Sequence, residues 1–326
     1  MDKQVKKLNN EGVKLFLNGN FEDAKLKYKE ALKVAPTYAT TLNNLGMISL
    51  QEKKYKNAEA LFKSAYDKQK KATYILNLGH AYANQNKIDK ARESYLKSIE
   101  LSPKSLMAWK SIAVLYQHQK QFQKSAHTWE YILQSLSTDA YFKIQLVKDY
   151  IELQKYQEAL GVLEETSKDE KLSEYVWYYT ALIHFNFKNF GLAEIAINKS
   201  ILISPNSETF RTLAASIYLG LSKVDKAITQ WNIILKQNQN NHKIRIDKGV
   251  TLLANRKYTE ALEAFNFVLS KTNNSKALFY KALVLLEMNS NAKEAITLLR
   301  KVVKMNDDYT EQAKELITRI TTNSNE

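Results

Sequence analysis

The feature that most constrains this chain is a small side chain that returns about every 34 residues. It ends a four-residue signature of an aromatic or aliphatic residue, two variable residues and then Ala or Ser, as in FEDA at 21–24 and YKNA at 55–58. The small residues are Ala24, Ala58, Ala91, Ser125, Ala159, Ala193, Ala227, Ala261 and Ala295. Seven of the eight spacings are 34 residues and one is 33. Such a period predicts stacked units that cannot bury their apolar faces alone.

Two further positions keep the phase of this period. With the small residue numbered 20 in a unit of 34, position 24 is apolar or aromatic in all nine units. Position 8 holds Gly12, Gly46, Gly79, Ala113, Val147, Ala181, Ala215, Gly249 and Leu283. Gly inside a helix costs about 1 kcal/mol relative to Ala, which is tolerated where another backbone must come close. We therefore predict that positions 8 and 20 mark the contact between two helices of a unit, with position 24 beside them.

The chain's three prolines, Pro36, Pro103 and Pro205, all fall at position 32, where each would end a second helix. A unit with small residues at 8 and 20, a bulky residue at 24 and Pro at 32 resembles the tetratricopeptide repeat (TPR). The resemblance implies an all-α fold, a right-handed superhelical solenoid of antiparallel helix pairs. We predict a TPR array over 5–309, followed by a capping helix and tail over 310–326. The nine predicted repeats are 5–38, 39–71, 72–105, 106–139, 140–173, 174–207, 208–241, 242–275 and 276–309.

Composition excludes several kinds of chemistry. The chain has no Cys, which removes disulfides, thiolate metal ligands and a cysteine nucleophile. No phosphate-cradling or hydrolase motif occurs, and the five histidines form no recognisable metal or catalytic pattern. We therefore predict no enzymatic activity, no catalytic residues, no metal and no cofactor. The start of the chain is polar and no run of about 18 apolar residues occurs, so we expect a cytoplasmic protein without a membrane span.

The net charge of +14 leaves two interpretations open. It reflects either a lysine-rich composition spread over a solvated surface or a basic surface that selects an acidic partner. Only six of the 48 basic residues are Arg, the residue that base and phosphate recognition favours. Nucleic acid is therefore the less favoured partner.

The first helix of each unit has a second face, at positions 2, 5, 6, 9, 12 and 13, which the TPR resemblance places along a concave groove. Position 6 carries Asn10, Asn44 and Asn77 in the first three units. Because an amide both donates and accepts hydrogen bonds, this series predicts a ladder that binds the backbone of an extended peptide. The alternative is that it merely reflects a chain rich in Asn.

Tyrosines gather on the same face in the fifth and sixth units. Tyr141 and Tyr175 occupy position 2, and Tyr178 and Tyr179 follow at positions 5 and 6. The polar side chains expected nearby are Lys110, Gln145 and Lys148. Tyr frequently anchors interfaces, so we predict a binding hot spot here. The alternative is that stacking buries these rings between adjacent first helices.

Together these patterns predict a non-enzymatic scaffold or adaptor that binds a peptide or protein segment in the concave groove. The alternative function is a nucleic-acid-associated regulator that uses its lysine-rich surface. Self-association through the end repeats is a further hypothesis.

Overall fold

The computed structural model describes residues 2–166 and 173–323, and every regular element in these ranges is an α-helix. The chain divides into two compact units, residues 1–169 and 170–326. The first unit contains α1 (Asp2–Leu17), α2 (Phe21–Val34), α3 (Ala39–Gln51), α4 (Tyr55–Lys68), α5 (Ala72–Ala83), α6 (Ile88–Leu101), α7 (Leu106–His118), α8 (Phe122–Ser135), α9 (Ala140–Glu152) and α10 (Tyr156–Thr166). The second contains α11 (Ser173–Asn186), α12 (Phe190–Ile203), α13 (Glu208–Gly220), α14 (Val224–Gln237), α15 (His242–Ala254), α16 (Tyr258–Leu269), α17 (Ser275–Glu287), α18 (Ala292–Met305) and α19 (Thr310–Asn323).

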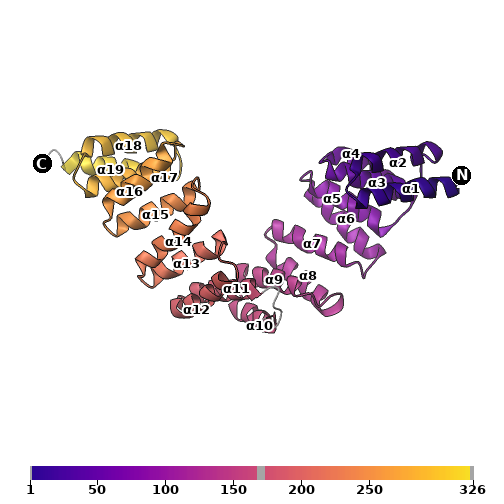
Figure 1. Ribbon diagram of the computed structural model, residues 1–326, viewed down its shortest axis with the longest axis horizontal. Helices are drawn as coiled ribbons and strands as arrows, with labels where there is room; N and C mark the ends of the chain where they lie inside the picture. The colour runs from indigo at the N-terminus through magenta and orange to yellow at the C-terminus, as the bar shows by residue number, and fades with distance from the viewer. Residues whose placement is uncertain (1, 167–172, 324–326) are drawn as a thin grey trace. The chain divides into compact units, whose positions relative to one another are not determined.

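Within each unit every helix packs against the next helix along the chain (Figure 1). The odd-numbered helices also contact each other, α1 with α3 and α3 with α5 in the first unit, and α11 with α13 and α15 with α17 in the second. Each unit is therefore a stack of helix pairs, with the first helices of successive pairs side by side. The predicted all-α solenoid of helix pairs is confirmed. The division into nine repeats and a cap remains our proposal, with one helix pair in each predicted repeat.

Side-chain volume at three positions explains how the two helices of a pair fit together. All nine small residues at position 20 have no solvent exposure, and all nine residues at position 24 are buried. The residue at position 24 of the second helix lies against position 8 of the first helix. A Cβ atom on Gly46, at position 8, would lie only 2.6 Å from Cε1 of Phe62 at position 24. The same approach recurs between Gly79 and Tyr95. The predicted contact positions are therefore confirmed, and the atom that requires a small residue is the edge of an aromatic ring.

The turn inside each pair has one conformation. The residue at position 15 is left-handed in the first eight pairs, as in Lys53 with φ 58°. The following amide reaches back to the helix, as in Lys54 N to Ser49 O at 2.8 Å. This six-to-one hydrogen bond is the Schellman closure of a helix end, and it satisfies a carbonyl that the helix leaves free.

The ninth pair is shifted by one residue. Its left-handed residue is Asn289, and the closing bond runs from Ser290 N to Leu285 O, both one position earlier than in the other pairs. Next to the predicted small position of α17, Ala282 is accordingly fully buried, whereas Leu283 is only half-buried. The 34-residue period predicts Leu283 at position 8, the position of the small residue. That assignment is wrong because the turn between α17 and α18 holds one extra residue.

Side chains also brace the turns between pairs. The indole Nε1 of Trp109 donates to the carbonyl of Pro103 at 2.8 Å, and Nε of Arg211 donates to that of Pro205 at 2.6 Å. A donor at position 4 thus holds the carbonyl of the proline at position 32 of the preceding pair. This bond ties the start of the next first helix to the turn that precedes it.

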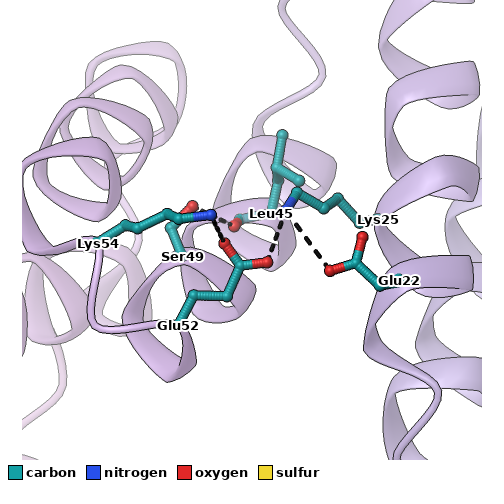
Figure 2. Close-up of polar contacts among 6 residues, drawn as sticks. All are labelled: Glu22, Lys25, Leu45, Ser49, Glu52 and Lys54. Carbon is teal, nitrogen blue, oxygen red and sulfur yellow. Dashed lines mark hydrogen bonds and ion pairs between the residues drawn. The ribbon is translucent and has the colours of Figure 1, made fainter.

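Lysines and carboxylates of neighbouring pairs form ion pairs. Figure 2 shows the carboxylate of Glu52 between Lys25 of the preceding pair at 2.6 Å and Lys54 at 2.7 Å. Lys87 and Lys223 make the same kind of contact with Glu59 and Glu194. Such partly exposed pairs each contribute no more than about 1 kcal/mol. Several lysines of this basic chain are thus engaged with its own acids.

The last helix covers the end of the second unit. Ala313 of α19 is fully buried, and Leu316, Ile317 and Ile320 pack against the apolar cluster formed with α17 and α18. The helix begins at Thr310 and runs to Asn323, and residues 324–326 lie outside the described residues. Among the helices described, none is long and apolar enough to cross a lipid bilayer.

Candidate functional site

The first helices of the N-terminal unit are joined by an asparagine network, formed by Asn9, Asn43, Asn44, Asn77 and Thr41. Oδ1 of Asn9 accepts from Thr41 Oγ1 at 3.0 Å and from Asn44 Nδ2 at 3.1 Å. Nδ2 of Asn43 donates to Asn44 at 3.3 Å, and Nδ2 of Asn77 donates to Asn43 at 2.8 Å. The network therefore links α1, α3 and α5 through side chains alone, with Asn9, Asn43 and Asn77 buried.

The predicted ladder of Asn10, Asn44 and Asn77 is only partly available to a ligand. Asn10 is exposed and makes no hydrogen bond with any described residue, whereas Asn44 is half-buried and Asn77 is buried. The side-chain amides of Asn44 and Asn77 each donate a hydrogen bond to an asparagine of the preceding repeat. Sequence reasoning missed Asn9 and Asn43, although both stand at position 5, beside the predicted series. Peptide binding by the ladder stays a prediction, with Asn10 and the exposed part of Asn44 as its free groups.

Four of the predicted side chains lie together on α7 and α9 in the same unit. The ammonium of Lys110 is 5.2 Å from the ring centroid of Tyr141, close enough for a cation–π interaction. Lys148 Nζ lies 3.4 Å from Gln145 Oε1, and no carboxylate in the described part of the chain pairs with it. Burial lowers the pKa of the Lys148 ammonium. The structure thus brings together an exposed ring and two lysines whose charge no ion pair neutralises.

Asp149, next to Lys148, is a functional candidate that sequence reasoning missed. Its side chain is buried, and its Oδ1 accepts from Gln117 Nε2 at 2.8 Å while its Oδ2 has no partner among the described residues. Burial raises the pKa of this carboxyl above its ordinary value. It stands at position 10, where the other repeats carry Lys14, Thr251 or an apolar residue, and it belongs to no motif recognised in the sequence.

The remaining predicted tyrosines form a second group, on α11 of the C-terminal unit. Tyr178 stacks on Phe210 of α13 with ring centroids 5.0 Å apart, and Tyr175 meets the same ring edge-on at 6.0 Å. Tyr179 packs against Tyr178 at 4.9 Å. Tyr175 is 42% exposed, while Tyr178 and Tyr179 are half-buried. Burial raises the pKa of both half-buried phenols.

The hydroxyl groups of Tyr175, Tyr178 and Tyr179 make no hydrogen bond with any residue that the structure describes, and none is a buried atom without a partner. The rings of Tyr175 and Tyr178 pack on Phe210 and the ring of Tyr179 packs on Tyr178, while the three hydroxyls remain accessible to solvent. Such a row can donate to and accept from a ligand with little loss of side-chain entropy. The expectation that stacking buries these rings holds only in part.

The histidines of the described ranges do not gather with carboxylates into a metal site. No group of three or more His, Asp or Glu side chains there could hold a metal ion. Nε2 of His80 hydrogen-bonds to Ser111 Oγ at 2.9 Å, and burial lowers the pKa of the His80 imidazole. His80 therefore serves as a neutral packing residue between α5 and α7.

Models of the tetratricopeptide repeat match the chain over 11–73, 72–105, 144–208, 212–275 and 246–310. The chain belongs to the tetratricopeptide repeat family. A TPR repeat-containing protein of Methanocaldococcus jannaschii, MJ1428, is 24% identical over 75% of this chain, which spans 46% of that relative's length. Arrays of stacked repeats present extended surfaces, and proteins of this family generally act as interaction scaffolds.

Solved structures show the same fold. The C-terminal part of a TPR repeat-containing protein from Cytophaga hutchinsonii superposes with a TM-score of 0.60 at 16% identity, covering 72% of this chain and 97% of that one. A chain of the APC/C hetero-tetramer Cut9–Hcn1 superposes with a TM-score of 0.55 at 18% identity, covering 85% and 55%. At these identities the likeness concerns the fold alone.

Proposed function

We propose that this chain is a non-enzymatic interaction scaffold that binds a peptide or protein segment on the faces of its first helices. The observation that carries the proposal is the row of Tyr175, Tyr178 and Tyr179, whose rings are packed while their hydroxyls have no partner among the described residues. Interfaces concentrate binding energy in tyrosines of this kind. The ordered rings keep the entropic cost of binding low.

The partner we propose carries acidic groups. In the N-terminal unit the first-helix face presents Lys110 and Lys148, and neither ammonium has an ion-pair partner among the described residues. Half-burial strengthens the attraction between the Lys148 ammonium and an incoming carboxylate, because less water screens the charge. Asn10 and Asn44 supply neutral amide contacts on the same unit.

The contacts of four arginines argue against the alternative function, a nucleic-acid-binding regulator, because these side chains are already engaged within the chain. Arg211 and Arg245 are committed to backbone carbonyls through 2.6 and 2.9 Å hydrogen bonds. Arg92 and Arg319 pair with carboxylates of their own helices. Phosphate contacts would make affinity fall steeply with salt, so a gel-shift titration at low and high salt distinguishes the two functions.

A hydroxyl-deletion variant tests the proposed function without disturbing the packing. Tyr175→Phe/Tyr178→Phe/Tyr179→Phe keeps the ring contacts with Phe210 and between residues 178 and 179. Each lost hydrogen bond to the partner weakens binding by about 0.5–1.5 kcal/mol. We expect the yield of partner captured from native extract by this variant to fall about tenfold or more. Tyr258→Phe on the second helix α16 is the matched control and should retain them.

The result that contradicts the proposal is an unchanged set of partners, at unchanged yield, for the triple variant. Circular dichroism of the variants must show the same helix content, so that loss of binding cannot come from unfolding. The corresponding Lys110→Gln/Lys148→Gln variant tests the acidic partner separately, since it removes charge and leaves the tyrosines intact.

A further inference from the structure

The second helix of the sixth predicted repeat exposes an apolar stripe on the side away from its partner helix. The α12 stripe consists of Leu192, Ile195, Leu202 and Ile203. Their side chains are 52%, 58%, 83% and 46% exposed. Leu192, Ile195 and Leu202 stand three and seven residues apart, which places them along one line of an α-helix. Large apolar side chains grouped in this way mark interaction sites on soluble proteins.

The neighbouring second helices of the same unit carry polar residues at the places of Leu192, Ile195 and Leu202. Those residues are Lys226, Thr229 and Lys236 on α14, Glu260 and Glu263 on α16 with Ser270 directly after it, and Glu294, Thr297 and Lys304 on α18. The stripe is therefore not a general property of the fold, which needs no apolar side chain at these positions. It lies on the second helix, whereas the tyrosine row lies on the first helix α11, so it is separate from the proposed peptide-binding face.

Positive charge borders the stripe. Lys188 lies in the turn two residues before the start of α12 and is exposed, with no ion pair to any described residue. Lys199 lies on the line of the stripe, and its ammonium sits 3.8 Å from the ring centroid of Trp177. On the flank toward α14 the carboxylate of Glu194 is shared by two lysines, Lys223 at 2.5 Å and Lys226 at 3.4 Å. Four ammonium groups and one carboxylate leave a net charge of 4 − 1 = +3 around the stripe.

We propose that the α12 stripe docks an amphipathic helix of another protein, whose apolar face is flanked by Asp and Glu. The stripe buries the apolar face, and Lys188, Lys199 and the excess lysine beside Glu194 pair with the flanking carboxylates. A second copy of this chain fits worse, because a symmetric contact would bring a charge of +3 against itself. The four side chains lie along about three turns of α12, which suits a helix laid alongside α12.

The test uses a displayed library of amphipathic 18-residue helices with Leu, Ile or Phe on one face and Glu, Gln or Lys at the flanking positions. The full-length chain is the bait, and Leu192→Gln/Ile195→Gln/Leu202→Gln is the stripe variant. Because all three residues are more than half exposed, we expect the variant to keep its helix content. Thr229→Gln, at the place of Ile195 on α14, is the matched control.

We expect helices selected on the wild-type chain to be enriched in Glu at the flanks. Their affinity should fall at least about tenfold on the stripe variant and remain unchanged on Thr229→Gln. Lys188→Glu/Lys199→Glu should shift the selected flanks from Glu toward Lys. Tyr175→Phe/Tyr178→Phe/Tyr179→Phe should leave this binding intact, which separates the stripe from the proposed peptide-binding face.

Three results would overturn the proposal. One is a selection that returns no helix whose binding depends on the stripe, or that returns flanks without an excess of Glu. Another is stripe-dependent self-association on sizing at several concentrations, which would assign the face to a second copy. The last is stripe-dependent sedimentation with vesicles of phosphatidylcholine and phosphatidylserine, which would assign it to a lipid surface.

Discussion

Gly46→Ala tests the close packing between the two helices of a pair. A Cβ atom on Gly46 would lie 2.6 Å from Cε1 and 2.8 Å from Cδ1 of Phe62, whose side chain is fully buried. A ring held by its neighbours on all sides cannot move away without disturbing them. Overpacking of this kind costs about 1–3 kcal/mol. Against this, Ala gains about 1 kcal/mol over Gly from its helix propensity.

Gly161→Ala is the matched control in the same unit. Gly161 lies within α10, and a Cβ there would meet nothing within 4 Å beyond its own helical turn. Because both variants gain the same propensity, the difference between them isolates the clash. We expect Gly46→Ala to be less stable than Gly161→Ala by about 1–3 kcal/mol in the free energy of unfolding. Gly249→Ala, where Phe265 would be 2.7 Å away, and Gly191→Ala, with nothing within 4 Å, repeat the comparison in the second unit.

Urea unfolding followed by circular dichroism measures the stability difference. A repeat array can open in parts, so hydrogen exchange of peptides from α3 and α4 should report the change locally. If Gly46→Ala proves as stable as Gly161→Ala, with exchange in α3 and α4 unchanged, Phe62 can move aside freely. The argument that position 8 must be small would then be refuted.

Two further predictions concern single polar groups. Trp109→Phe removes the 2.8 Å hydrogen bond to Pro103 and should cost about 0.5–1.5 kcal/mol in urea unfolding, with faster hydrogen exchange just after the turn; unchanged stability would show that water replaces the bond. Burial raises the pKa of the Asp149 carboxyl in the folded protein. Ionisation of this group therefore lowers the stability of the wild type as pH rises through the folded-state pKa, and Asp149→Asn removes the effect. The stability of Asp149→Asn relative to wild type should therefore increase from about pH 4 to about pH 7, and a difference that does not vary with pH would contradict this.

Much of the helix arrangement could be predicted because it depends on the size of a few side chains. Ala24 and its eight counterparts are fully buried, since only a small residue lets two helices approach at that level. The 34-residue period was misleading at Leu283, because the turn before α18 holds one extra residue and Ala282 takes the place of the small residue. Counting residues cannot detect such an insertion, because the signature on α18 itself stays in phase. The six-to-one hydrogen bond from Ser290 to Leu285 reveals it.

The candidate site was harder to predict, because it depends on what each polar group contacts. Asn10 and Asn77 occupy equivalent positions in their repeats, yet Asn10 is exposed and Asn77 is buried with its amide on Asn43. Likewise Tyr175 and Tyr178 both contact Phe210, yet Tyr175 is 42% exposed while Tyr178 is half-buried. Which groups remain free is decided by the neighbouring repeat.

The sequence by itself determined that this protein is a stack of helix pairs, because a 34-residue pattern of small and bulky side chains admits no other packing of its apolar faces. Only the tertiary structure decided which surface polar and apolar groups lack partners within the chain. Hydrogen bonds between repeats depend on distances of a few tenths of an ångström across separate helices, and a sequence does not specify these. The α12 stripe likewise was recognised as a surface only from the exposure of its side chains.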